Sequence, residues 1–351
     1  MEWIAEYGVF LLKSATVLVA LVMFVGFLAS LSQRQRSDQR EGHVKIQSLN
    51  DDHEDNLDDF LASVLEPDVY KQRKKDEKKV KKAEAKALKK GGKKDSSTES
   101  ARPRVFVLDF DGDIKASAVE GLRKEISTLI ANKAEGDSVI LRLESPGGMV
   151  HSYGLAASQL NRIKSAGIKL IVSVDAVAAS GGYMMACVAD EIIAAPFSVI
   201  GSIGVVAQVP NVHRLLKKND VDVEVLTAGK YKRTLTVLGE NTEEGRQKFI
   251  DDLESTHTLF KGFVQEHRPT LDIENVATGE IWYGKEALEK GLVDRIATSD
   301  DLILDALKTS QVFRVSYEHK KSLAERLGFA AEQGVVKAFE QLWAQQTKRW
   351  F

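Results

Sequence analysis

The sequence predicts an α/β protein with a mostly parallel sheet. From about residue 103, short runs rich in Val, Ile and Leu alternate with stretches of helical periodicity. This alternation is typical of parallel strands joined by helices. We predict strands at 105–110, 139–143, 170–174 and 221–226, and helices at 115–133, 150–165, 181–189 and 242–266. With 351 residues, 43% of them apolar and 28% charged, the chain can bury a sizeable core.

The N-terminal segment is predicted to cross a membrane. Residues 14–31 are uncharged and mostly apolar, and as a helix they would extend about 27 Å, close to the hydrocarbon thickness of a bilayer. A cleaved signal peptide is the alternative, but the apolar run is long for one, and Glu2 and Glu6 make its start acidic. We therefore expect one transmembrane helix within residues 1–33.

The charges around this helix bear on its orientation. Arg34, Arg36, Arg40 and Lys45 follow the apolar run, whereas only Lys13 and the amino terminus precede or enter it. Because positive charge near a membrane helix favours the cytoplasmic side, the pattern predicts a cytoplasmic location for the rest of the chain.

A charged spacer is predicted between the membrane helix and the α/β domain, over residues 34–102. Residues 50–69 are acidic, whereas residues 71–94 carry thirteen Lys or Arg against three Asp or Glu. We expect a polar helix over 71–90 and a flexible joint around 91–100. The lysine run is either a solvated spacer or a segment attracted to anionic lipid headgroups. Since the basic residues gather outside the folded domain, no nucleic-acid partner is expected.

The C-terminal residues are predicted to form a separate element. Within residues 320–349, apolar side chains at Leu323, Leu327, Val335, Phe339 and Leu342 recur near helical spacing. This amphipathic helix would pack on a partner, on its own domain or on a membrane surface. The predicted organisation is therefore an anchor (1–33), a spacer (34–102), an α/β domain (103–318) and a C-terminal helix (319–351).

Cysteine and histidine usage argues against a metal centre. Cys187 is the only cysteine, which excludes an intramolecular disulfide and any multi-cysteine zinc site. The seven histidines are scattered without close ligand spacing. We expect neither a metal nor an organic cofactor.

Two glycine-rich segments at strand ends are candidates for catalysis. The first, Ser-Pro-Gly-Gly at 145–148, ends a predicted strand and precedes a helix, so the amide of Gly148 could stabilise an oxyanion. The second places Ser180 between small residues at a strand-to-helix transition, with the amide of Gly181 as another donor. The alternatives are a simple tight turn at the first segment and a helix N-cap role for Ser180.

A nucleophilic serine requires a general base. His151 falls on a predicted helix and His213 in a polar stretch, so a histidine-based triad is unsupported. A lysine can serve if burial lowers its pKa from about 10.4 to about 7. Lys232 is a candidate, and Lys230 is two residues away; composition alone would make this cluster an exposed basic turn.

These segments resemble the signal peptide peptidase A family of membrane serine proteases. The resemblance covers residues 103–310 and rests on motifs in the same order along the chain. They are Ser-Pro-Gly-Gly at 145–148, Ala-Ser-Gly-Gly-Tyr at 179–183, Ile-Gly-Ser-Ile-Gly-Val at 200–205, Gly-Lys-Tyr-Lys at 229–232, and Gly-Lys-Glu-Ala-Leu to Gly-Leu-Val-Asp at 284–294.

The resemblance implies specific roles and a specific fold. Ser180 matches the nucleophile, Lys232 the general base, Ser202 a serine that orients the lysine, and Gly148, with Gly147 beside it, the main oxyanion donor. The implied fold is the ClpP/crotonase type, built from repeated β-β-α units. Family members form rings, which implies a homo-oligomer, eight-fold here, with the lysine supplied by a neighbouring subunit. The implied location is the bacterial inner membrane, with the protease domain on the periplasmic side, against the charge pattern.

The favoured function is a membrane-anchored Ser/Lys endopeptidase acting on membrane-derived peptides or unfolded proteins. A crotonase-like acyl-CoA enzyme is one alternative, because that fold also uses glycine amides for an oxyanion. A non-catalytic membrane scaffold ring is the other. Ser180→Ala distinguishes the three functions. It would abolish peptide hydrolysis by the endopeptidase, leave thioester turnover by the acyl-CoA enzyme unchanged, and have no effect on any phenotype of the scaffold.

Overall fold

The computed structural model describes residues 42–90 and 102–319, which fall into two units. Residues 42–45 and 317–319 belong to one unit, and residues 46–316 form the other. The predicted transmembrane helix and C-terminal helix lie outside the described residues, as does almost all of the predicted joint. Within the described ranges, no helix is both long and apolar enough to span a bilayer.

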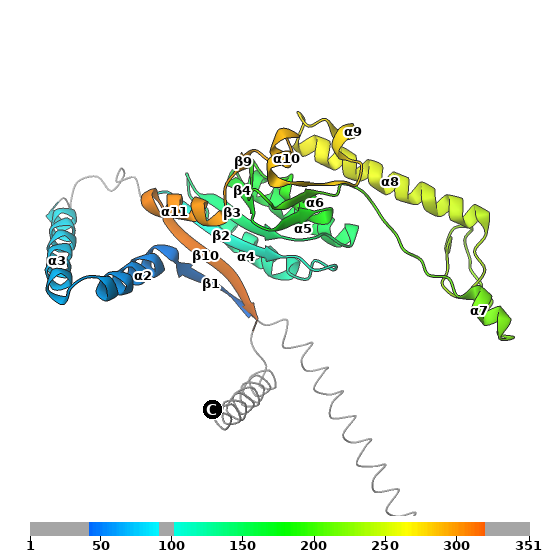
Figure 1. Cartoon of the computed structure of the whole chain (residues 1–351), viewed down its shortest axis with the longest axis horizontal. Helices are drawn as coiled ribbons and strands as arrows, with labels where there is room; N and C mark the ends of the chain where they lie inside the picture. The colour runs from blue at the N-terminus through cyan, green and yellow to red at the C-terminus, as the bar shows by residue number, and fades with distance from the viewer. Residues whose placement is uncertain (1–41, 91–101, 320–351) are drawn as a thin grey trace, which may run out of the picture. The chain divides into compact units, whose positions relative to one another are not determined.

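The main sheet has seven strands and is parallel at its centre. Its order is β1 (Gly42–Ser48), β10 (Gln311–His319), β2 (Arg104–Asp111), β3 (Ser138–Glu144), β4 (Lys169–Val174), β6 (Glu191–Ala194) and β9 (Arg295–Ile296). Every pairing from β10 to β9 is parallel. The mostly parallel sheet is confirmed, and three of the four predicted strands appear as β2, β3 and β4 (Figure 1).

A second, small sheet supports the candidate catalytic segments. It consists of β5 (Val177–Ala179), β7 (Val199–Gly201) and β8 (Ile281–Tyr283), with β5 and β7 parallel and β7 and β8 antiparallel. A single bridge between Ser145 and Ala178 joins the end of β3 to β5. The glycine turn and the Ser180 segment therefore leave neighbouring strands at one corner of the fold.

Helices cover both faces of the main sheet. α4 (Val119–Ala131) and α5 (Val150–Ser165) pack together against β2 and β4. α11 (Ser299–Thr309) covers the other face, where its Leu302 meets Val105, Val107 and Ile140. Since successive strand residues point to opposite faces, the consecutive buried residues Val105 to Leu108 of β2 contribute to both layers. The short α6 (Gly181–Ala186) is buried throughout.

The described part of the predicted spacer contains strand β1 of the main sheet and two helices, α2 (Leu49–Val64) and α3 (Pro67–Lys90). The polar helix predicted over 71–90 is confirmed as part of α3, whereas strand β1 was not predicted. The start of α2 is fixed to the domain by Asn50. Its side chain accepts from the amide of Val312 (2.7 Å) and donates to the carbonyl oxygen of Ser310 (3.2 Å). Asp58 on α2 pairs with Lys74 and Tyr70 on α3.

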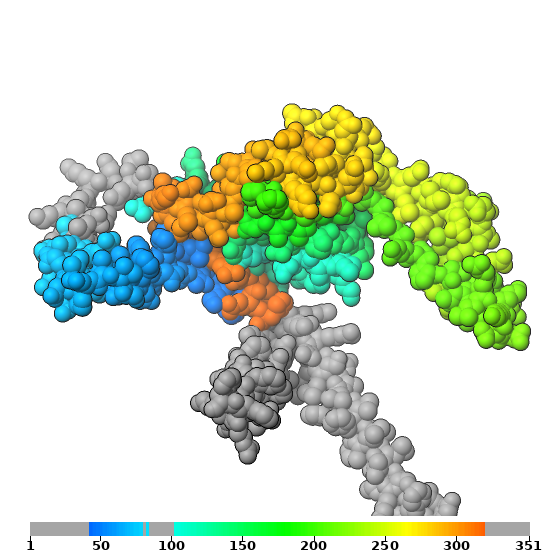
Figure 2. Space-filling model, in the orientation of Figure 1, coloured from blue at the N-terminus to red at the C-terminus, as the bar shows by residue number. Residues whose placement is uncertain are grey.

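Residues 205–259, here called the arm, stand out from the sheets (Figure 2). They contain α7 (His213–Lys218) and most of α8 (Glu243–His267), whose buried residues are only Phe260 and Val264 near its end. The strand predicted at 221–226 is wrong, because this segment forms no regular structure in the described chain. A strand is stable only when a neighbouring strand accepts its hydrogen bonds, and Leu226 is 88% exposed.

The base of the arm is held by an ion pair at the end of α8. Arg268, whose side chain is only 12% exposed, donates to both carboxylate oxygens of Asp294 (2.8 and 2.7 Å). Asp294 also accepts from the amide of Ile192 at the start of β6 (2.8 Å). Burial alone would raise the pKa of Asp294, but the bonds from Arg268 and Ile192 outweigh it and hold the pKa below the usual 3.8.

Asp294→Asn should destabilise the protein at neutral pH. It leaves the Arg268 guanidinium without its charge partner, at a cost of about 1–2 kcal/mol, between the values for exposed and buried pairs. Because the folded-state pKa is lowered, the ionised carboxylate stabilises the fold above pH 3.8, and this contribution disappears as the pH falls further. Urea unfolding should show that the difference in unfolding free energy between the variant and wild type is smaller at pH 3 than at pH 7. An equal difference at both pH values would contradict this account.

Candidate active site

The glycine turn after β3 leaves one free amide between two occupied ones. The amide of Gly147 donates to Ser145 Oγ (3.1 Å), and the amide of Met149 donates to the carbonyl oxygen of Ile114 (2.8 Å). The amide of Gly148, between them, donates to no acceptor within the described residues. A methyl group on Gly148 would overlap the carbonyl oxygen of Ile114, so only glycine fits there. The turn thus presents an N–H group able to bind an anion.

Ser180 occupies a strained position between β5 and α6. Its φ of 53° and ψ of −118° are unusual for a residue with a side chain, at a cost of order 1–3 kcal/mol. The amide of Ser180 donates to the carbonyl oxygen of Gly201 (2.8 Å), which fixes the segment against β7. Ser180 does occupy the N-cap position of α6, as the alternative predicted, but its half-buried side chain makes no capping bond to the helix.

The turn and the serine touch each other. Gly147 has φ +90°, which favours glycine, and a methyl group there would lie 2.7 Å from Ser180 Cβ and 2.8 Å from the amide nitrogen of Gly181. The backbone of the glycine turn therefore lies directly against Ser180 and the amide of Gly181. Backbone amides beside a serine hydroxyl are what an oxyanion site of acyl transfer requires, and the sequence predicts Gly148 and Gly181 for that role.

Ser202 also lies at this corner. In the parallel pairing of β5 with β7, Ala179 is opposite Gly201, so Ser180 and Ser202 leave the two strands side by side. Ser202 has φ 50°, and its amide donates to the carbonyl oxygen of Glu280 (2.6 Å). Ser180 and Ser202 are two of the four non-glycine residues with positive φ in the described ranges, which concentrates strain at the site.

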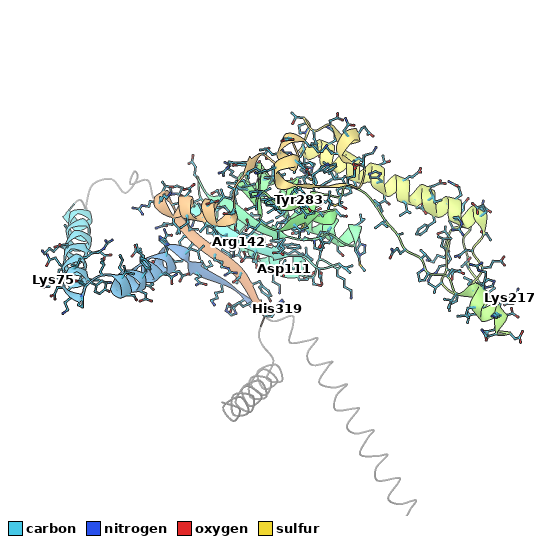
Figure 3. The ribbon with its side chains drawn as sticks, viewed as in Figure 1. Lys75, Asp111, Arg142, Lys217, Tyr283 and His319 are labelled. Carbon is cyan, nitrogen blue, oxygen red and sulfur yellow. The ribbon has the colours of Figure 1, made fainter. Side chains whose placement is uncertain are left out.

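The structure does not bring Lys232 to Ser180. Lys232 is exposed in the arm, in the segment between α7 and α8. In Figure 3, Lys217 at the end of α7 lies far from Tyr283 on β8, the strand that pairs with β7. The described residues of a single chain therefore bring Ser180 and the glycine turn together but leave Lys232, the predicted base, in the exposed arm.

Lys230 has a different environment from Lys232. Its ammonium pairs with Glu244 on α8 (2.7 Å) and lies 4.9 Å from the centre of the Tyr231 ring. The bond to Glu244 raises the pKa of Lys230 above its usual value, so this amine stays protonated. Lys230 is therefore unsuited to act as a base.

The described residues show no histidine base and no metal ligands beside Ser180. His151 is exposed on α5, as predicted, and His213 begins α7 in the arm. In the described part of the chain, no group of three His, Cys, Asp or Glu residues is arranged to hold a metal ion.

The sequence analysis missed Tyr153, which lies beneath the site. Its buried hydroxyl is 2.6 Å from Ser145 Oγ and donates to the carbonyl oxygen of Asp113 (2.8 Å). The one indication that the sequence offered for Tyr153 is its position on the inner face of the helix that follows the glycine turn. The chain pattern alone does not reveal which way its hydroxyl points.

Known families and proteins match this chain over most of its length. The model "Peptidase family S49 N-terminal" matches residues 2–160, and "Peptidase family S49" matches residues 162–312. "Probable protease SohB" of Haemophilus influenzae is 53% identical and covers 97% of both chains. A protein of the same name from Buchnera aphidicola subsp. Schlechtendalia chinensis is 50% identical over 87% of this chain and 99% of its own.

A solved structure of a point mutant of the 1510-N membrane-bound stomatin-specific protease, in complex with a substrate peptide, aligns with a TM-score of 0.40 at 16% identity. The alignment covers 65% of this chain and 96% of that one.

The family models and the SohB relatives make this chain a peptidase of the serine class. The chain belongs to peptidase family S49. The resemblance to signal peptide peptidase A proteases drawn from the motifs is thereby confirmed, and the relatives named SohB align with this chain along most of its length.

Gly147→Ala should destabilise the protein by at least about 2 kcal/mol, because it combines a strained φ with overlap against Ser180. Gly154→Ala is the matched control, since a methyl group there meets nothing within 4 Å. On α5 it should stabilise by up to about 1 kcal/mol. Urea unfolding of both variants checks this, and equal stability of the two would contradict the close approach.

Proposed function

We propose that this protein is a membrane-anchored serine endopeptidase that uses a Ser180/Lys232 dyad. Its substrates would be membrane-derived peptides or unfolded proteins, and the domain would adopt the ClpP/crotonase arrangement. The observation that supports the proposal is the close approach of Gly147 to the strained Ser180, because a serine hydroxyl beside the backbone of a glycine turn suits an acyl-transfer site. Membership of a peptidase family supports peptide bonds, rather than thioesters, as the target.

The proposed mechanism uses only groups of this chain. Neutral Lys232 takes the hydroxyl proton of Ser180 as the oxygen attacks a peptide carbonyl. The amides of Gly148 and Gly181 bind the oxyanion, and Ser202 orients the lysine amine. The lysine ammonium returns its proton to the leaving amine, and water then deacylates the serine with the same base. No step requires a metal or an organic cofactor.

We further propose that the dyad is completed in a homo-oligomeric ring, eight-fold by family resemblance. The arm carries apolar residues that a single chain leaves exposed, including Val206 (85%), Leu215 and Leu226 (88%). Apolar surface of this kind marks a protein interface. Packing the arm against another copy would bring Lys232 to a neighbour's Ser180 and desolvate its amine, which favours the neutral form.

The membrane anchor is likewise part of the proposal. Residues 14–31 would hold the protein in the bacterial inner membrane, and the two sequence arguments place the protease domain on opposite sides of it. A reporter fused after Lys45 separates them, because alkaline phosphatase is active only on the periplasmic side.

The purified, detergent-solubilised full chain should hydrolyse casein. Ser180→Ala and Lys232→Ala should each lower the rate by at least about 10³-fold, because each removes a group that acts in every turnover. Size-exclusion chromatography of each variant controls for assembly. Activity that survives in both variants would disprove the dyad. An intact wild-type ring without activity would favour a scaffold role instead.

The two lysines of the arm should respond differently to substitution by arginine. Lys232→Arg should abolish hydrolysis, because a guanidinium does not give up a proton near neutral pH. Lys230→Arg should be tolerated, since arginine keeps the ion pair with Glu244. Casein hydrolysis by the two variants decides the assignment, and the reverse result would identify Lys230 as the base.

A further inference from the structure

A directed chain of hydrogen bonds runs beneath the glycine turn. The hydroxyl of Tyr153 donates to the carbonyl oxygen of Asp113 (2.8 Å), so it is left to accept from the hydroxyl of Ser145 (2.6 Å). The oxygen of Ser145 in turn accepts from the amide of Gly147 (3.1 Å). Each hydroxyl is used once as donor and once as acceptor, so the chain has a single direction.

This chain decides which amide of the turn is free. With the amide of Gly147 bound to Ser145 and that of Met149 bound to Ile114, only the amide of Gly148 between them remains available. Without Ser145 Oγ, the peptide unit of Gly147 would lose its inner partner. That peptide unit could then rotate, which would change the backbone angles of Gly147 and with them the direction of the Gly148 amide in the next peptide unit.

Tyr153 also supports the second donor. A methyl group on Gly181 would overlap the Tyr153 ring, so the ring lies directly against the first residue of α6. A methyl group on Gly112 would lie 2.6 Å from the Tyr153 hydroxyl and would overlap Ser145 Oγ. The two polar side chains are therefore enclosed, and both are fully buried.

We propose that Ser145 and Tyr153 are positioning residues of the oxyanion site, which hold the amides of Gly148 and Gly181 toward Ser180. This inference rests on the proposed function, because it assigns the turn to an acyl-transfer site. Burial raises the pKa of Tyr153, which keeps its hydroxyl protonated and able to donate to Asp113. Neither side chain would touch the substrate.

The positioning role predicts a loss in kcat with KM unchanged. Removing an oxyanion donor outright costs about 10²–10³ in kcat, so misplacing one should cost roughly 10-fold in Tyr153→Phe and more in Ser145→Ala. The double variant should be no slower than Ser145→Ala alone, because Tyr153 acts through Ser145. A purely structural role predicts a lower stability of these variants without a lower kcat in the molecules that fold.

The test uses the full-length protein and a quenched-fluorescent peptide that spans a casein cleavage site mapped by mass spectrometry. Tyr183→Phe is the matched control. Tyr183 is also fully buried and donates to a backbone carbonyl, that of Leu292 (2.9 Å), away from the turn. It should lower the melting temperature as Tyr153→Phe does, yet keep kcat.

The proposal would be overturned if kcat is unchanged in a folded Tyr153→Phe or Ser145→Ala. It would also be overturned if the kcat losses of these two variants add in the double variant, or if Tyr183→Phe loses as much kcat. If Tyr153→Phe does not fold, Ser145→Ala carries the test against Tyr183→Phe. Wild-type hydrolysis that is absent, or that persists in Ser180→Ala, would instead refute the proposed function and this inference with it.

Discussion

The close approach of Gly147 to Ser180 is the constraint on which the site depends. Two chain segments meet where a single methyl group would lie 2.7 Å from the serine Cβ, so the backbone of one segment faces the side chain of the other. The fold holds this approach from both sides. The Ser145–Ala178 bridge joins the strands that carry the two segments, and the Ser180–Gly201 hydrogen bond fixes the serine to β7. The positive φ of Ser180 is tolerated because the buried α6 follows directly.

The arm buries far less apolar surface than the sheet domain does. The parallel sheet and its helices bury their apolar residues within one chain, whereas the arm leaves Leu226 and Val206 in solvent. The helix α8 meets the domain at its C-terminal end, where Phe260 and Val264 are buried and Arg268 pairs with Asp294. A nucleophile in the rigid part and a base on the exposed part would make catalysis depend on assembly. Such a protease would be inactive as a single chain, which would protect the cell before the ring forms.

The sequence predicted much of this architecture, and its failures have physical causes. β2, β3 and β4 were predicted closely because each is a mostly apolar run, and α5 because its helical pattern follows a clear turn signal. The strand expected at 221–226 failed because strand propensity requires a pairing partner, which this segment lacks in the described chain. Two glycine-rich motifs led to the prediction of Gly148 and Ser180, which the structure brings to one corner of the fold. Tyr153 was missed because its contact with Ser145 is made only in the folded state. The same limit applies to Lys232, whose place beside a serine is not determined by local sequence.

The most direct test of the central claim is to find which residue reacts as the nucleophile. The detergent-solubilised full chain would be treated with a fluorophosphonate, digested and mapped by mass spectrometry. The account predicts one phosphonylated residue, Ser180, and no label at that peptide in Ser180→Ala. Labelling of Ser202 or another serine in place of Ser180, or casein hydrolysis by a preparation whose Ser180 stays unmodified, would contradict it.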